Sequence, residues 1–432
     1  IIMLLALFIL LLIIAIVLYI SDKKIISSII FFFFLFDSFQ LIPEEWVGLK
    51  TLDLAIIYIC VLFIYGLFQY DNYIPKNKTI LAISLFLGFI CFEMLLSHYY
   101  YSIGWGEIIR TGRQHILLLS YFVFRKVNRQ ELDIILKVLF IIVIFESFLF
   151  TIQMFTGIGI LNGKEVYAKV GSLYRFYNIS LMHYFFVFYA IFYNPFKGFW
   201  KHITMLIVVI TIFFPMHRSL DMTFVVLLIL GILWKKKVFN SAKKIAITCS
   251  CFFLLLIVAS AYISVRTMED INKVAAGDFQ EFEDIQASSE ATFLFRVGHF
   301  YERYTTVLEN TVSKWFGLGF MTEGSSYTEN HFDFIIGLDS KEGGIEQVNT
   351  PDISWSILII RYGIVGTLLF IIFYFYFVGY YVQYRNKSTI NMVMVLYLLL
   401  IFSNSLTSDL LYKMNMLIFP LIYMNQYEEE IS

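Results

Sequence analysis

Residues 1–20, IIMLLALFILLLIIAIVLYI, decide the class of fold. They contain no charged residue, no glycine and no proline, and a helix of about 20 such residues crosses the hydrocarbon core of a bilayer. The stretch lacks the basic start and the small-residue cleavage site of a secretory signal, so we interpret it as a retained membrane span. Apolar runs of this kind recur along the chain. The sequence therefore predicts an all-α, polytopic membrane protein.

The overall composition agrees with this class. Of 432 residues, 59% are hydrophobic, 19% are aromatic and 15% are charged, whereas a soluble domain carries about 25% charged residues. The mean hydropathy is +0.76. The formal net charge of −1 gives no general attraction for nucleic acid, so we expect no nucleic-acid partner.

Motifs that hold a cofactor or a metal are missing from the sequence. It has no Gly-rich phosphate loop ending in Lys-Ser or Lys-Thr, no HExxH and no Cys-x-x-Cys. The four cysteines, Cys60, Cys91, Cys249 and Cys251, lie in apolar segments, where free cysteine behaves as a small hydrophobe. We therefore predict no metal and no cofactor.

Thirteen segments are predicted to span the membrane, at residues 3–20, 25–40, 52–68, 79–96, 107–124, 132–154, 179–193, 203–216, 220–234, 245–263, 353–382, 392–403 and 410–424. They divide the chain into ten spans in residues 1–263, a large loop at 264–350, and three spans with a tail in 351–432. The weakest span is the fifth, because its first half carries Arg110, Arg113 and His115.

Basic residues in the loops predict the orientation. They fall in every second loop: SDKK (21–24), PKNK (75–78), RKVNR (125–129), FKGFWKH (196–202), the lysines of 235–244 and QYRNK (383–387). Positively charged loops stay in the cytoplasm. The N-terminus and the loop at 264–350 are therefore expected outside the cell, and the C-terminus inside.

The large loop is predicted to be partly helical. The stretch ATFLFRVGHFYERYTTVL (291–308) has apolar residues at helical spacing, and Arg296, His299 and Arg303 share another face. At its end, NTPD places Thr350 as the N-cap of the next span and Pro351 at its first helical position.

Charged residues inside the predicted spans are candidates for function, because burying them in a bilayer is costly. They fall mainly in the outer halves of the spans: Asp37, Asp53, Glu93, Arg110, Arg113, Glu146, His183, Arg218, Asp221 and Arg361. This one-sided distribution predicts a site that opens outward, whereas a transporter needs polar groups that reach both faces.

Several of these residues also have a structural interpretation. Arg218 and Asp221 are three residues apart and can neutralise each other on one helix face. Arg361 can extend outward to the interface, and Arg110 with Arg113 can hold lipid head groups. Glu146 can be a protonated carboxyl or the partner of an arginine.

Arginines on the outer side predict an anionic substrate. Arg175 in SLYRFYN and Arg296 and Arg303 in the large loop add to Arg218, which follows His217. A guanidinium group offers a planar fork of donors that suits phosphate oxygens. We therefore expect a lipid-linked phosphate or pyrophosphate. His331 is a candidate general base, although a solvated loop histidine is the simpler interpretation.

The segments FRVGHFYERY, SKWFGLGF and NTPDISWSILIIRYGIVGTLLF, together with an arginine at the outer boundary of a middle span and a large late outer loop, resemble the Wzy/O-antigen ligase superfamily. The resemblance covers the architecture of the whole chain and about a third of it at the level of motifs. It implies a bacterial, metal-independent glycosyltransferase of the cytoplasmic (inner) membrane.

In that family the substrates are oligosaccharides linked to polyprenyl pyrophosphate, and polymerases transfer a growing glycan onto another lipid-linked repeat unit. The resemblance maps the pyrophosphate ligands onto Arg218 and Arg296. From the residues themselves we add further candidates for binding, Arg110, Arg113, Arg175, His217, Arg303 and Arg361, and candidates for a base, Glu146, Glu93 and His331. Expected partners are membrane lipid, a flippase and a chain-length regulator. Ligases usually carry His-Asn near the end of the loop, where this chain has Val348-Asn349. A polymerase is therefore favoured, with a ligase or a lipid-linked oligosaccharide flippase as alternatives.

Overall fold

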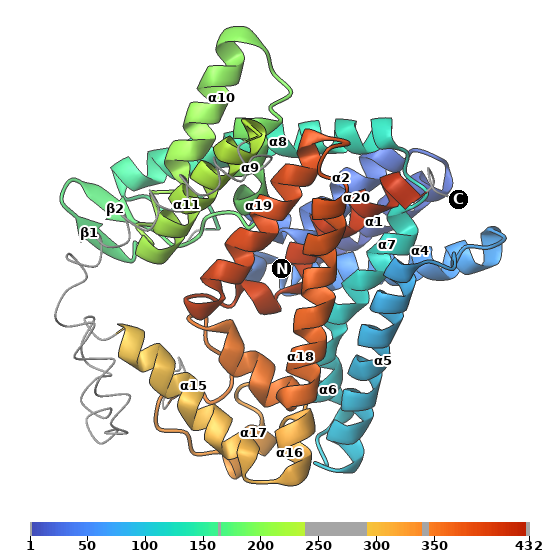
Figure 1. Ribbon diagram of the computed structural model, residues 1–432, viewed down its shortest axis with the longest axis vertical. Coiled ribbons are helices and arrows are strands. Elements are labelled where there is room, and N and C mark those ends of the chain that lie inside the picture. Colours follow the sequence, from blue (N-terminus) through green and yellow to red (C-terminus); the bar gives the residue numbers. More distant parts are fainter. Residues whose placement is uncertain (1, 163–165, 238–291, 339–344, 429–432) are drawn as a thin grey trace.

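The computed structural model describes residues 2–162, 166–237, 292–338 and 345–428, which are mostly helical (Figure 1). Up to residue 156 the elements are α1 (Ile2–Ile20), α2 (Lys24–Leu35), η1 (Asp37–Gln40), α3 (Glu44–Val47), α4 (Thr51–Gln69), α5 (Lys78–Tyr99), α6 (Trp105–Gly112), η2 (Arg113–Leu119), α7 (Ser120–Phe124) and α8 (Arg129–Thr156). The η elements are 3₁₀ helices.

The second part contains a two-stranded antiparallel hairpin and the remaining helices. In order they are β1 (Ala168–Val170), β2 (Leu173–Arg175), α9 (His183–Phe192), α10 (Gly198–Thr211), α11 (Arg218–Lys235), α15 (Thr292–Leu308), α16 (Thr311–Phe316), α17 (Ser326–His331), α18 (Ser354–Gln383), α19 (Thr389–Ser403), η4 (Asn404–Leu406), η5 (Leu410–Tyr412), η6 (Met414–Leu417) and α20 (Ile418–Glu428).

Six helical segments of the described chain are long and apolar enough to cross a membrane, which supports a membrane protein. They are Met3–Ile20, Thr51–Gln69, Lys78–Tyr99, Arg129–Thr156, Ser354–Gln383 and Thr389–Leu406. Four more apolar helices are shorter, at Lys24–Leu35, His183–Phe192, Gly198–Thr211 and Met414–Met424. The predicted count of thirteen is thus not confirmed, and the predicted span at 245–263 lies outside the described residues.

The predicted fifth span is helical but broken into the three pieces α6, η2 and α7. It follows α5 in the opposite direction. Tyr101, just before α6, donates to the carbonyl of Gly317 (2.7 Å), and Tyr121 in α7 accepts from the amide of Asn77 at the start of α5 (2.8 Å). The segment therefore returns the chain along the length of α5, but it is not among the described helices that are long and apolar enough to cross a membrane.

The first three predicted basic loops lie together in the fold. The Tyr19 hydroxyl donates to the carbonyl of Val123 (2.7 Å), and the Lys126 ammonium lies 4.3 Å from the ring centroid of Tyr70. The C-terminal ends of α1, α4 and α7 are therefore neighbours.

The helices of the large loop, α15 to α17, form one end of the molecule (Figure 1). The stretch SKWFGLGF joins them to the bundle. The N–H of Leu318 donates to the carbonyl of Ile360 in α18 (2.6 Å), and the N–H of Phe320 donates to the hydroxyl of Ser97 in α5 (2.9 Å). α18 is kinked here at Gly363, with φ 60° and ψ −163°. A Cβ at this position would lie 2.4 Å from the backbone nitrogen of Gly317, so glycine permits both the kink and the contact.

The start of α18 corrects one prediction. Thr350 and Pro351 precede the helix, which begins at Ser354 after Ile353. The Thr350 hydroxyl accepts from the N–H of Asp352 (3.1 Å), and the carbonyl of Pro351 accepts from Asp409 (3.0 Å). The NTPD segment therefore forms a turn that is fixed to the last interhelical loop, because its backbone groups bond outside α18.

Candidate functional site

The candidate site is built around Arg175, at the end of β2. Its Nε donates to the carbonyl of Pro215 (2.8 Å), and its Nη2 donates to the carbonyl of Met216 (3.0 Å). The guanidinium also stacks over the ring of Tyr177, 4.5 Å from the centroid. Arg175 therefore holds the turn that joins α10 to α11. A guanidinium has five N–H donors, so it keeps others for a ligand.

His217 occupies the N-cap position of α11. Its Nδ1 lies 3.2 Å from the Ser219 hydroxyl, which lies 2.7 Å from the hydroxyl of Thr407 in the last loop. Burial is the main cause that lowers the pKa of His217, followed by the positive charge of Arg296. The imidazole is therefore neutral near pH 7, because its ordinary pKa is already about 6.5.

Arg296, on α15, approaches the same turn from the large loop. Its Nη2 lies 3.6 Å from the Oδ1 of Asp352. Its Nε is buried and has no hydrogen-bond partner in the described part of the chain. The charges of Arg296, Asp352 and Arg175 all act on His217. Three segments that are far apart in the sequence thus meet at the N-terminus of α11.

Arg218 is the first residue of α11, and its side chain is exposed. No ion pair or hydrogen bond of this side chain is found within the described ranges. The alternative pairing with Asp221 is not seen there: one oxygen of Asp221 is buried without a hydrogen bond, and the cation whose charge acts on it is Arg175.

This arrangement has the properties of an anion site. The first backbone N–H groups of a helix have no acceptor within the helix, and the helix dipole adds a partial positive charge. Arg175, Arg218 and Arg296 add three full positive charges at the start of α11. A phosphate group fits such a position by charge and by hydrogen bonding. We call Arg175, His217, Arg218, Arg296 and Asp352 the α11 cluster.

Arg303 does not belong to this cluster. Its side chain is fully buried, and it donates to the carboxylate of Glu302 (2.7 Å) and to the carbonyl of Gln347 (3.1 Å). A further bond joins it to the carbonyl of Ile336. Burial lowers its pKa to about 10, so it remains charged at pH 7. Its bonds fix the end of the large loop against α15.

Two more predicted arginines have partners within the protein. Arg361 is buried and donates to the Tyr412 hydroxyl (2.7 Å) and to the Oδ1 of Asn349 (3.0 Å). Arg113 pairs with Asp53 (2.8 Å). Arg110 is exposed at the end of α6. The structure does not bring these three residues into the α11 cluster through any described contact.

The two candidate bases also lie apart from the cluster in their contacts. His331 is exposed, and its Nδ1 bonds to the carbonyl of Tyr327, one turn earlier in α17. Glu146 is buried in α8, where the Ser180 hydroxyl is the polar side chain that acts on its carboxylate. His217 is the histidine that lies among the arginines.

Asp352, Tyr177 and Glu323 are the residues that sequence reasoning missed. Asp352 and Tyr177 contact the arginines of the cluster. The Glu323 carboxylate accepts from three successive N–H groups, those of Gln347, Val348 and Asn349, at 2.7, 2.8 and 2.9 Å. The SLYRFYN stretch carries a signal for Tyr177, an aromatic ring two residues from an arginine. Nothing in the sequence around Glu323 distinguishes it from other loop carboxylates.

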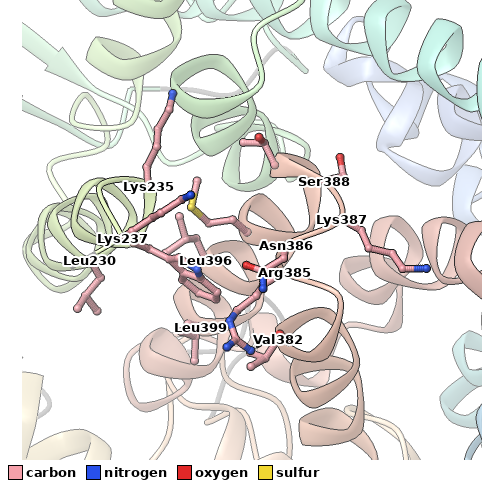
Figure 2. A pocket seen from close by; sticks show the side chains of 13 residues that line it. Leu230, Lys235, Lys237, Val382, Arg385, Asn386, Lys387, Ser388, Leu396 and Leu399 are labelled. Carbon is pink, nitrogen blue, oxygen red and sulfur yellow. Dashed lines mark hydrogen bonds between the residues drawn. The ribbon is translucent and has the colours of Figure 1, made fainter. Parts of the chain in front are cut away.

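Two cavities differ in size and position. A cavity of about 60 Å³ lies beside His217, Tyr177 and Ser408. It is smaller than the roughly 300 Å³ of an ordinary ligand pocket, so a large substrate would lie on the exposed side of the cluster. A cavity of about 960 Å³ lies elsewhere, between the end of α11 and the α18–α19 loop (Figure 2). Among the described residues no three His, Cys, Asp or Glu side chains gather as metal ligands.

Comparisons with known proteins do not assign the chain to a family. No family model matches it, and no curated protein matches it.

Proposed function

We propose that the protein is a bacterial polysaccharide polymerase. In this proposal it transfers a growing glycan from polyprenyl pyrophosphate onto a lipid-linked oligosaccharide repeat unit, on the outer face of the cytoplasmic membrane. The observation that carries the proposal is the meeting of Arg175, His217, Arg218 and Arg296 at the N-terminus of α11. The resemblance to the Wzy/O-antigen ligase superfamily supplies the class of reaction.

The pyrophosphate would lie against the α11 cluster. As the bond between the anomeric carbon and the pyrophosphate oxygen breaks, the bonding electrons remain on that oxygen. Negative charge therefore grows next to the guanidinium groups and the free N–H groups of α11. Fixed donors that face a developing charge in a site of low water content lower the barrier strongly. Three guanidinium groups supply this charge in a metal-independent reaction.

The acceptor is a sugar hydroxyl, whose oxygen forms the new bond to the anomeric carbon. Its proton needs a base within hydrogen-bond reach. We propose His217 for this role in preference to His331, because its pKa is lowered and its imidazole lies among the arginines that would hold the leaving group. Glu146 is not preferred as the base, because it lies farther along α8. It is about seven residues, or about 10 Å, from Gln153, whose side chain bonds to Asn178 near the cluster (3.0 Å).

We infer the orientation in the membrane from the basic residues in the loops between the helices. The loops rich in lysine and arginine would face the cytoplasm. The α11 cluster and α15 to α17 would then lie outside, where lipid-linked repeat units are polymerised. Expected partners are membrane lipid, a flippase and a chain-length regulator.

The proposal is tested by the lipid-linked glycans of a strain that lacks the protein. A polymerase predicts the accumulation of single repeat units on the outer leaflet. Long lipid-linked chains would indicate a ligase, and units trapped on the inner leaflet would indicate a flippase; either result would refute the proposal. An Arg296→Ala variant should fail to restore polymer. The matched control is Lys50→Ala, which removes an exposed charge at the start of α4 and should restore polymer fully.

A further inference from the structure

The larger cavity, of about 960 Å³, lies between two segments that are far apart in the sequence. One is the end of α11 with the following residues up to Lys237, and the other runs from the end of α18 into α19 (Figure 2). None of its lining residues belongs to the α11 cluster, which lies at the opposite end of α11.

The rim of this cavity is basic. Lys235, Lys237 and Arg385 line it and are exposed, and Lys387 also lines it. No acidic residue is among its lining residues. Positively charged side chains gathered around one cavity attract a phosphate group. No carboxylate among the described lining residues neutralises their charge.

The start of α19 adds to this field. Ser388 is its N-cap and Thr389 its first residue, and both line the cavity. The Ser388 side chain makes no capping hydrogen bond, so it does not occupy the first N–H groups of the helix. The partial positive charge of the helix N-terminus thus has the same sign as the basic rim.

The wall of the cavity is apolar. Leu230, Trp234, Met392, Leu396 and Leu399 line it beside the basic residues. These residues belong to α11 and α19. Met392 and Leu396 are buried, whereas Leu230, Trp234 and Leu399 are partly exposed. A lining that combines exposed cations with apolar side chains matches a molecule with an anionic head and a hydrocarbon tail, and it matches a free phosphate ion poorly.

We propose that this cavity binds one anionic phospholipid of the cytoplasmic leaflet. The lipid phosphate would lie against Lys235, Lys237, Arg385 and the start of α19, and an acyl chain would lie along Trp234 and Leu230, which are partly exposed and one turn apart in α11. Basic residues near the cytoplasmic surface bind anionic lipids in this way. The site is separate from the proposed polymerase site and does not depend on that function.

Trp234 provides the measurement. The purified, delipidated protein is titrated with phosphatidylglycerol that carries brominated acyl chains, which quench tryptophan on contact. The difference between the wild type and Trp234→Phe isolates the signal of this one indole among six tryptophans. We expect brominated phosphatidylglycerol to quench this signal at a concentration at least tenfold lower than brominated phosphatidylcholine does. Equal midpoints for the two lipids would overturn the proposal.

Charge variants test the rim directly. Each cation near a membrane surface strengthens binding about fivefold, so the combined variant Lys235→Ala, Lys237→Ala and Arg385→Ala should weaken phosphatidylglycerol binding at least tenfold. If that variant does not fold, the single variants Lys237→Gln and Arg385→Gln should each weaken it several-fold. The matched control replaces three exposed lysines of other basic loops, Lys23, Lys76 and Lys78, by alanine and should leave the midpoint unchanged. An unchanged midpoint in the rim variants would refute the site.

A competition experiment separates a lipid from a free anion. Unbrominated phosphatidylglycerol should restore the Trp234 fluorescence, whereas inorganic phosphate at millimolar concentration should not. Full displacement by phosphate alone would show an anion site without a role for the acyl chain, and would overturn the assignment to a phospholipid.

Discussion

Replacing Arg218 by lysine tests the anion site most directly. The side chain is exposed at the first position of α11, with no ion pair or hydrogen bond to described residues. Substitutions at such positions change the free energy of unfolding by about 0.5 kcal/mol or less. Arg218→Lys should therefore leave folding and abundance unchanged.

Its effect on activity should be much larger. A guanidinium can form two parallel hydrogen bonds with one phosphate group, whereas an ammonium cannot reproduce this fork. A hydrogen bond to a charged group is worth about 1.5–3 kcal/mol. The loss of one such bond corresponds to a decrease of about 10- to 150-fold. The assay is polymer formation by the purified protein in detergent, from a defined lipid-linked repeat unit.

The alternative, a structural pair of Arg218 with Asp221, predicts the reverse. Lysine would then support normal activity, and the double variant Arg218→Ala with Asp221→Ala would fold better than Arg218→Ala alone. We expect the two alanine substitutions to add in their effect on thermal stability. Full activity of Arg218→Lys, or a coupling well above 0.5 kcal/mol between the two alanine substitutions, would refute the assignment of Arg218 as a ligand.

Three further predictions concern the orientation, the kink and the proton transfer. A cysteine at Ser326, exposed in α17, should react with an impermeant thiol reagent in intact cells, whereas one at Asn386 should react only after permeabilisation; the opposite pattern would overturn the orientation. Gly363→Ala should destabilise the protein by several degrees in a thermal scan, because its φ of 60° and the contact with Gly317 exclude a Cβ, whereas Gly379→Ala in the same helix meets nothing within 4 Å and should be neutral. The lowered pKa of His217 keeps the base neutral down to an acidic pH. Activity should therefore fall as the pH drops below this pKa, and His217→Gln should lose the pH dependence together with most of the activity.

The sequence predicted the long helices well, because each has a continuous apolar run and a recognisable start. α8 begins with a capping box in which Asn128 and Glu131 bond each other's backbone, and it extends over the predicted span. The segment after α2 was predicted less well. Ser38 and Phe39 have positive φ values of 54° and 53°, which end the helix within an apolar run, and such a change of direction depends on tertiary packing.

The sequence predicted the types of residue in the candidate site, but not which residues belong to it. Arg175, Arg218 and Arg296 were predicted to face outward, a placement that stays a prediction, and the structure brings them to one helix N-terminus. Arg303 had the same sequence signal as Arg296, since both lie on one face of the same helix. The two differ because distant backbone carbonyls, such as those of Ile336 and Gln347, accept hydrogen bonds from Arg303. The sequence does not show which carbonyls will lie near which arginine.

The difference between these two arginines yields a final prediction. A buried guanidinium needs acceptors for its donors, and removing a hydrogen-bonded buried charge costs about 3–5 kcal/mol. The acceptors of Arg303 are all supplied by the protein, so Arg303→Ala should lower the thermal stability and the abundance of the protein. Arg296 has a carboxylate oxygen at 3.6 Å and a buried Nε without a partner in the described chain, a state that a bound anion would relieve. Arg296→Ala should therefore leave the melting temperature within a few degrees of the wild type and abolish binding of a pyrophosphate analogue, measured by calorimetry. If Arg296→Ala unfolds the protein as Arg303→Ala does, Arg296 is a structural residue and the anion site loses its contribution from the large loop.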